Sequence, residues 1–236
     1  MGEYTWYKKR ERVLPVPIRA LPTVLAEKWM DIHPETDRSL SLESPVFDKA
    51  GNLIVCCNAV DPAIGEKLIR ICPDGTIVDF FQIPGMRITG VALHRDGRFF
   101  CTDLRGHLVI LGPEGEILRI QEITDPDGTK MAPDDLVFDE NGDVYFTDLR
   151  GWAAEPLGGV YRMRQEDDYR TFEPVLTRLA GPNGISFSPD FRQLWVAQSG
   201  AKSLINLELM PNKLPNPHGG IHVIPMSLGV GIPDSN

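Results

Sequence analysis

The sequence contains no run of 18 apolar residues, and its charged first residues lack the apolar stretch of a signal peptide. We therefore expect no transmembrane helix, no membrane partner and a cytoplasmic location. Cysteine is scarce as well, with four residues, of which Cys56 and Cys57 are adjacent. The cysteines lie in strand-like patterns, so we expect small buried side chains rather than a disulfide or zinc framework.

The sequence is also poor in positive charge. It contains 24 Lys and Arg and 33 Asp and Glu, which gives a formal net charge of −9 at pH 7. A nucleic-acid partner requires a basic face, so we expect none. His218 and His222 are separated by a segment with two glycines, which argues against a helical zinc site. No serine or cysteine lies in a Gly-x-Ser-x-Gly elbow or in the setting of a triad, which argues against a covalent nucleophile.

What the sequence does contain is a repeat of about 46 residues. Successive copies begin at Glu43, Thr89, Asp134 and Asn183, with spacings of 46, 45 and 49 residues, and a fifth begins at Asp234, 51 residues further on. Within a copy, two short runs of alternating apolar residues flank a turn signal, such as Asp-Gly or Asn-Gly. This pattern predicts an antiparallel hairpin.

Further short strands are expected between the copies, for example 68–72 and 76–80 around a Pro-Asp-Gly turn. Four strands in a unit of about 40 to 50 residues are typical of β-propeller blades, and no stretch has a sustained helical period. The sequence therefore predicts an all-β propeller. We assign residues 1–40 to an N-terminal arm that could supply a ring-closing strand, and residues 41–236 to the propeller.

The residues that open the copies are the candidate site, because the innermost strands of propeller blades line a central channel. These residues carry only oxygen donors: Glu43, Thr89, Asp134, Asn183 and Asp234. Carboxylates that face one cavity repel one another unless a proton or a cation intervenes. Oxygen donors of this charge suit a hard divalent cation, calcium first and magnesium or manganese next. Asp and Asn before a strand also cap turns, which is the alternative at each single position.

Several motifs, in their order and spacing, resemble the SMP-30/gluconolactonase/LRE-like family, and within it the lactonases of the drug-responsive protein 35 type. The motifs are residues 132–139 (APDDLVFD), 145–151 (YFTDLRG), 158–161 (GGVY), 182–185 (PNGI) and 233–235 (PDS). The resemblance implies a six-bladed propeller, a calcium ion in the channel and hydrolysis of lactones. Magnesium, manganese and zinc are the alternative ions.

The resemblance also implies roles for particular residues. The metal ligands would be Glu43, Asp134, Asn183, Asp234 and Ser235, with Asp234 also the acid that transfers a proton. A second metal site of the drug-responsive members would fall on Asp127 and Thr129. From their own places in the sequence, the candidates for contact with the substrate are Thr89, Asp135, Arg150 and Trp152.

The expected reaction is hydrolysis of a lactone, with sugar lactones first, by a water activated on the cation and with Asp234 moving the proton. Two alternatives stay open: a phosphotriesterase-like hydrolase on the same scaffold, and a non-catalytic, truncated propeller that binds a partner. The copies account for about four blades and the opening of a fifth, and closing a six-bladed ring would need on the order of 70 to 90 more residues. The particular lactone and the oligomeric state also stay open.

Overall fold

The computed structural model describes residues 25, 27–32, 40–59, 66–226 and 234. The chain divides into two compact units, Met1–Pro34 and Glu35–Asn236. Most of the predicted N-terminal arm lies outside the described residues. All strands discussed below belong to the second unit.

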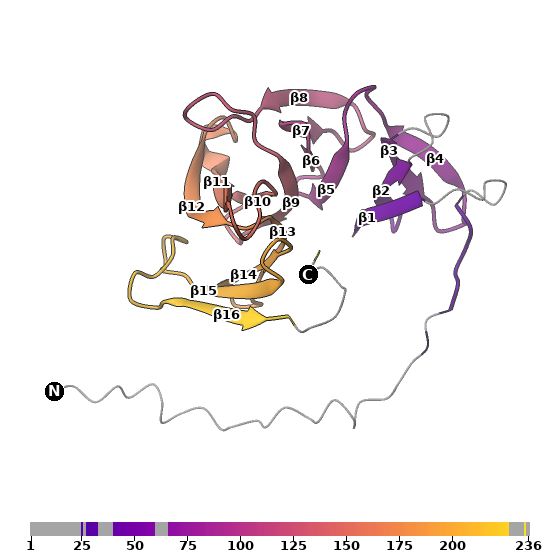
Figure 1. The fold of residues 1–236 in the computed structure, drawn as a ribbon. Coiled ribbons are helices and arrows are strands. Elements are labelled where there is room, and N and C mark those ends of the chain that lie inside the picture. Colours follow the sequence, from indigo (N-terminus) through magenta and orange to yellow (C-terminus); the bar gives the residue numbers. More distant parts are fainter. Residues whose placement is uncertain (1–24, 26, 33–39, 60–65, 227–233, 235–236) are drawn as a thin grey trace. The chain divides into compact units, whose positions relative to one another are not determined.

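The second unit consists of four antiparallel sheets, each a meander of four strands that are consecutive in the chain (Figure 1). The first sheet holds β1 (Leu40–Phe47), β2 (Leu53–Ala59), β3 (Glu66–Ile71) and β4 (Ile77–Phe81). The second holds β5 (Ile88–Leu93), β6 (Phe99–Asp103), β7 (His107–Leu111) and β8 (Ile117–Glu122). The third holds β9 (Pro133–Phe138), β10 (Val144–Asp148), β11 (Gly158–Met163) and β12 (Phe172–Leu179). The fourth holds β13 (Pro182–Phe187), β14 (Gln193–Gln198), β15 (Ser203–Glu208) and β16 (Ile221–Pro225).

The prediction of an all-β propeller is confirmed, with four blades in the described part of the chain. Each of the first four copies of the repeat begins in the first strand of a blade, which is β1, β5, β9 or β13. Helix is limited there to one short 3-10 turn at Gln165–Asp167. Of the fifth copy only Asp234 is described, so the six-bladed, truncated ring stays a prediction.

The turn between β9 and β10 shows why the repeat forms hairpins. A side-chain oxygen of Asp139 accepts hydrogen bonds from the backbone N–H groups of Asn141, at 2.8 Å, and Asp143, at 3.0 Å. Gly142 has a φ of 91°, a conformation that glycine adopts without steric cost. The Asp and Gly of this turn signal therefore stabilise the reversal directly.

The hydrophobic core lies between neighbouring blades. Ile54 and Leu68 of the first blade pack with Phe99 and Val109 of the second in one buried cluster. Equivalent clusters join the second blade to the third and the third to the fourth. All four cysteines are free thiols; Cys56, Cys57 and Cys101 are buried, as predicted, whereas Cys72 is only partly buried.

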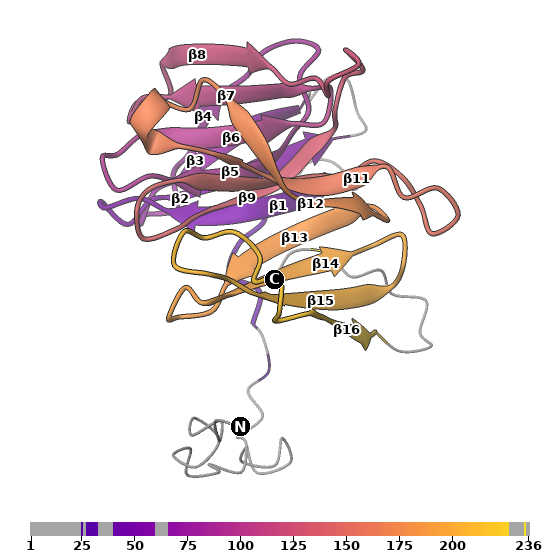
Figure 2. The same ribbon diagram turned by 90° about the vertical axis from the view of Figure 1, so that its left-hand side faces the viewer.

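This packing brings the first strands of the blades together, because β5 contacts both β1 and β9, and β9 contacts β13. Figure 2 shows the fourth sheet beside the third. The starts of β1, β5, β9 and β13, where the copies of the repeat open, therefore face one region. Within the described segments, no helix is long and apolar enough to cross a membrane.

Candidate active site

A cavity of about 140 Å³ lies where the first strands of the blades begin. Its lining residues are Glu43, Arg87, Thr89, Leu104, Asp134, Asp135, Leu149, Asn183 and Asp234. The structure thus brings together all five residues that open the copies of the repeat, together with Asp135. Ser235 lies outside the described residues.

The site residues occupy places where the first strand of a blade leaves its regular pairing with the second. Thr89 lies between two paired positions, Ile88 opposite Asp103 and Gly90 opposite Thr102. Asp134 and Asp135 fall in the corresponding interruption between β9 and β10, and Asn183 in that between β13 and β14. Irregularities of this kind re-aim side chains and are common beside active sites.

Burial and mutual repulsion control the charge of the cavity. Asp134 is 6% exposed, and burial raises its pKa to about 7. The neighbouring carboxylates of Asp135, Glu43 and Asp234 contribute to this rise, and the hydroxyl of Thr89 opposes it. Burial also raises the pKa of Asp135, to about 6. A cation or a shared proton in the cavity would relieve this repulsion.

Asp135 is held by the backbone around it. Its Oδ1 accepts a hydrogen bond from the N–H of Leu136, at 2.9 Å, and its Oδ2 accepts one from the N–H of Ile185 on the next blade, at 3.2 Å. Both bonds favour the charged carboxylate and so lower the pKa of Asp135 against the effect of burial. With both oxygens engaged, Asp135 helps to join the third blade to the fourth.

The buried hydroxyl of Thr89 indicates that the cavity can bind a ligand. Its side chain is 5% exposed, and its hydroxyl oxygen has no partner at hydrogen-bond geometry. The hydroxyl is near enough to Asp134 to lower the pKa of that carboxyl. A buried hydroxyl without a partner is costly, so a ligand that supplies one would be favoured.

Arg87, Leu104 and Leu149 line the cavity but were not among the predicted site residues. Arg87 stands two residues before Thr89, and its side chain lies 3.9 Å from a carboxylate oxygen of Glu66. Leu104 and Leu149 occupy the same position in two identical Thr-Asp-Leu-Arg-Gly segments, 45 residues apart. That internal identity was the signal in the sequence that could have identified these two leucines.

Arg150 and Trp152 do not line the cavity. The guanidinium of Arg150 pairs with the carboxylate of Asp148, with Nε 2.9 Å from Oδ2, and with that of Asp125, also at 2.9 Å. Trp152 is 68% exposed, and its backbone N–H donates to the carbonyl of Glu155. Contact of either residue with a substrate stays a prediction.

The predicted second metal site lies in a turn whose polar groups bond to one another. The backbone N–H of Thr129 lies 3.0 Å from a carboxylate oxygen of Asp127 and 3.0 Å from one of Asp125. A hydrogen bond with the side chain of Asp125, followed by those from Thr129, lowers the pKa of Asp127 to about 2. A metal role for Asp127 and Thr129 stays a prediction.

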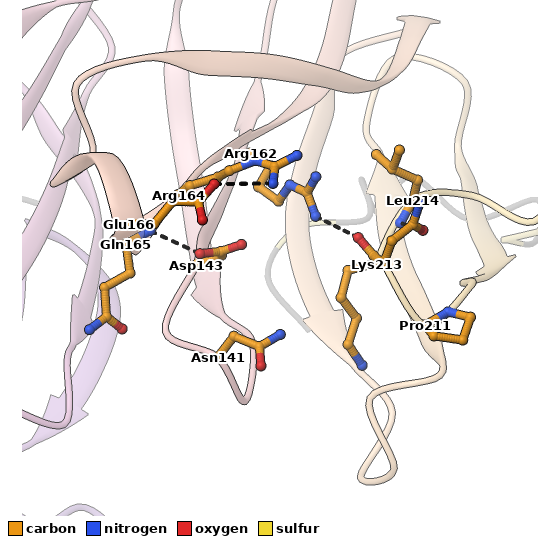
Figure 3. Close-up of a pocket in the computed structure, with 10 residues that line it drawn as sticks. Asn141, Asp143, Arg162, Arg164, Gln165, Glu166, Pro211, Lys213 and Leu214 are labelled. Atoms are coloured by element: carbon orange, nitrogen blue, oxygen red, sulfur yellow. Dashed lines mark hydrogen bonds and ion pairs between the residues drawn. The ribbon is translucent and has the colours of Figure 1, made fainter.

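A different hollow, of about 510 Å³, lies between the third and fourth blades (Figure 3). Its cationic side chains are already paired: Arg162 and Arg164 with Glu173, and Lys213 with Glu140. The Nη1 of Arg162 also donates to the carbonyl of Asn212, at 2.8 Å. The contacts of Lys213 and of the Asn212 carbonyl join the two blades, and none of the predicted site residues that the structure describes lines this hollow.

The cavity residues fit an oxygen-liganded divalent cation by their chemistry. The donors are carboxylates, an amide and a hydroxyl, and one of them, the Thr89 oxygen, is buried without a partner. Among the residues that the structure describes, no three His, Cys, Asp or Glu side chains are grouped so that they could hold a metal ion. Amide and hydroxyl oxygens would therefore have to complete the ligand set.

The family model for the SMP-30/Gluconolactonase/LRE-like region matches residues 41–235. The chain belongs to this family. Lactonase drp35 of Staphylococcus saprophyticus is 33% identical to it over 213 residues, which are 86% of this chain and 62% of the relative. The chain thus spans less than two thirds of the length of that family member.

Solved structures support the fold of this family member. A gluconolactonase from Xanthomonas campestris matches with a TM-score of 0.61 at 20% identity, over 84% of this chain and 67% of that chain. Regucalcin from Agrobacterium tumefaciens, a calcium-binding protein, matches with a TM-score of 0.59 at 16% identity, over 79% and 59%. At these identities the likeness shows a common fold and no more.

Proposed function

We propose that this chain carries the active site of a calcium-dependent lactone hydrolase. The observation that carries the proposal is the convergence of Glu43, Asp134, Asn183 and Asp234 on one cavity. Membership of the family supports hydrolysis, because the relative from Staphylococcus saprophyticus is a lactonase. Calcium is the first choice of ion because hard oxygen donors prefer it and because the structurally similar regucalcin binds calcium.

The four residues would hold the ion from four different strands or segments, with Thr89 and Ser235 as further donors. Magnesium, manganese and zinc are the alternative ions. When bound, a divalent cation polarises a lactone carbonyl and makes a bound water more acidic. Its positive charge would also favour the deprotonated form of Asp134 at neutral pH, against the effects of burial and of the neighbouring carboxylates.

The residues of the chain would supply the proton transfer and the walls. A carboxylate oxygen of Asp234 accepts a proton from the attacking water and returns it to the ring oxygen as the carbon–oxygen bond breaks. The product is the open hydroxy acid. Leu104 and Leu149 form apolar walls for the carbon skeleton, and Arg87 is a cation at the edge that can bind polar oxygens of the substrate.

The experiment is hydrolysis of D-gluconolactone and dihydrocoumarin by the purified protein, followed with a pH indicator before and after chelation with EDTA. Asp234→Asn removes the proposed proton acceptor. Asp79→Asn, an exposed aspartate of β4 that pairs with Lys67, is the matched control. We expect turnover that EDTA abolishes, calcium restores, Asp234→Asn lowers at least about 100-fold and Asp79→Asn leaves unchanged.

Other outcomes separate the alternatives. Hydrolysis of a phosphotriester such as paraoxon, without hydrolysis of either lactone, would favour the hypothesis of a phosphotriesterase-like hydrolase. A folded protein that turns over none of these probes with added calcium would favour a propeller that only binds a partner.

A further inference from the structure

Three site residues have their backbone carbonyls held by a hydroxyl of the preceding blade. The hydroxyl of Ser44 in β1 donates to the carbonyl of Thr89, at 2.6 Å. The hydroxyl of Thr147 in β10 donates to the carbonyl of Asn183, at 2.7 Å. The hydroxyl of Thr102 in β6 donates in the same way to the carbonyl of Asp134. One kind of contact thus recurs at all three junctions between blades.

These contacts fall where the strand pairing is interrupted. Thr89, Asp134 and Asn183 each lie in or beside a break in the register between the first and second strands of their blade. A backbone group that is buried outside the ladder needs another partner. The hydroxyls of the preceding blades supply that partner.

Thr147 makes a second contact that ties two site residues together. Its oxygen also accepts a hydrogen bond from the backbone N–H of Asp135, at 3.1 Å. Thr147 is fully buried, and so is Thr102. One buried hydroxyl therefore spans Asp135 on the third blade and Asn183 on the fourth.

The aspartates that follow these threonines hold the site strands of their own blades. The Oδ1 of Asp103 accepts a hydrogen bond from the backbone N–H of Arg87, at 2.7 Å, and the Oδ1 of Asp148 accepts one from Ala132, at 2.9 Å. Arg87 and Ala132 each stand two residues before a residue that opens a copy of the repeat. The identical Thr-Asp pairs thus brace the opening of their own blade and of the next one.

We propose that Thr102 and Thr147 are positioning residues of the site, which set the spacing between donors contributed by adjacent blades. The inference rests on the proposed function, because the donors are those that would hold the cation and the lactone. Since each blade contributes only one or two of these oxygen ligands, a shift of one blade relative to the next changes the distances between the ligands. Partners that orient ligating groups in this way affect metal affinity and activity.

The test replaces the hydroxyl while keeping the shape of the side chain. Thr147→Val removes the hydroxyl, and Thr147→Ser retains it. Thr171→Val is the matched control, because the hydroxyl of Thr171 bonds to the turn residue Asp167 at an exposed position of the same blade. Calcium affinity is measured by titration calorimetry and kcat/KM with D-gluconolactone, at a temperature where circular dichroism shows each variant folded.

We expect Thr147→Val to lose about 10-fold in calcium affinity and in kcat/KM, and Thr147→Ser to stay within about threefold of the wild type. Thr171→Val should match the wild type. Thr102→Val should lose affinity in the same way, and Thr147→Ala replaces Thr147→Val if the valine variant does not fold.

Wild-type affinity and activity in Thr147→Val would overturn the inference and leave the proposed function standing. Equal losses in the serine and valine variants would also overturn it, because packing and not the hydroxyl would then be responsible. A wild-type protein that neither binds calcium nor hydrolyses the lactone would contradict the proposed function itself.

Discussion

Gly90 faces the backbone carbonyl of Asp134 across the junction between the second and third blades, so closely that an added β-carbon would collide with it. The same β-carbon would also collide with the hydroxyl of Thr102, which donates to that carbonyl. The absence of a side chain at Gly90 therefore allows the two blades to approach at the candidate site. Gly90 is required for space and not for backbone conformation.

Replacement of Gly90 by Ala should therefore destabilise the protein strongly. We expect a loss of about 3 kcal/mol or more, since neither a backbone carbonyl nor a buried hydroxyl can move away cheaply. Gly75→Ala is the comparison: Gly75 has a φ of 85° and nothing within 4 Å of its added β-carbon. A loss of only about 1 kcal/mol is expected there. Urea unfolding measures both losses of stability. Equal losses would show that the close contact between Gly90 and the carbonyl of Asp134 does not exclude a β-carbon.

The stability of the metal-free protein should fall as the pH rises. Burial raises the pKa of Asp134 from 3.8 to about 7, so the folded protein favours the protonated carboxyl. The resulting contribution to stability is complete below about pH 4 and is lost by about pH 7, on the order of 4 kcal/mol. Asp135, with a pKa of about 6, acts in the same direction.

Urea unfolding in EDTA between pH 4 and pH 8 checks this dependence, with Asp134→Asn as the variant that should flatten it. Calcium should raise the melting temperature more at pH 8 than at pH 5, because it binds the deprotonated carboxylates. A metal-free protein that becomes more stable between pH 5 and pH 7 would contradict the buried, protonated state of Asp134.

Arg87 should contribute to substrate binding more than to chemistry. Arg87→Met keeps the length of the side chain and removes the charge at the edge of the cavity. We expect KM for D-gluconolactone to rise about fivefold with kcat little changed, as fits a partly exposed charged contact of about 1 kcal/mol. Arg105→Met is the control, because Arg105 also pairs with Glu66, at 3.2 Å, but does not line the cavity. Equal changes in both variants would assign the effect to the ion pair with Glu66.

The periodic part of the site could be predicted from the sequence. A repeat in a propeller places equivalent residues at equivalent positions, so the spacing of Glu43, Thr89, Asp134 and Asn183 was enough to bring them together. The same reasoning identified the blades, because each hairpin depends on local alternation and turn residues. Both predictions, of the site residues and of the blades, could be made without knowing how the blades contact one another.

Contacts between blades could not be predicted in this way. The hydroxyl of Thr147 reaches a carbonyl 36 residues later in the chain, and nothing local in the sequence shows that it points forward. The partners of Arg150 could not be predicted either. Its guanidinium pairs with the fully buried carboxylate of Asp148, a choice of partner that only the folded chain reveals.

Calcium binding by the cavity is the central claim, and titration calorimetry of the wild type and of Asp134→Asn at pH 7.5 tests it most directly. The account predicts a calcium site that Asp134→Asn weakens at least about 10-fold, with Asp79→Asn as an unaffected control. Calcium affinity that is the same in the wild type and in Asp134→Asn, or no binding by a folded wild type, would contradict it.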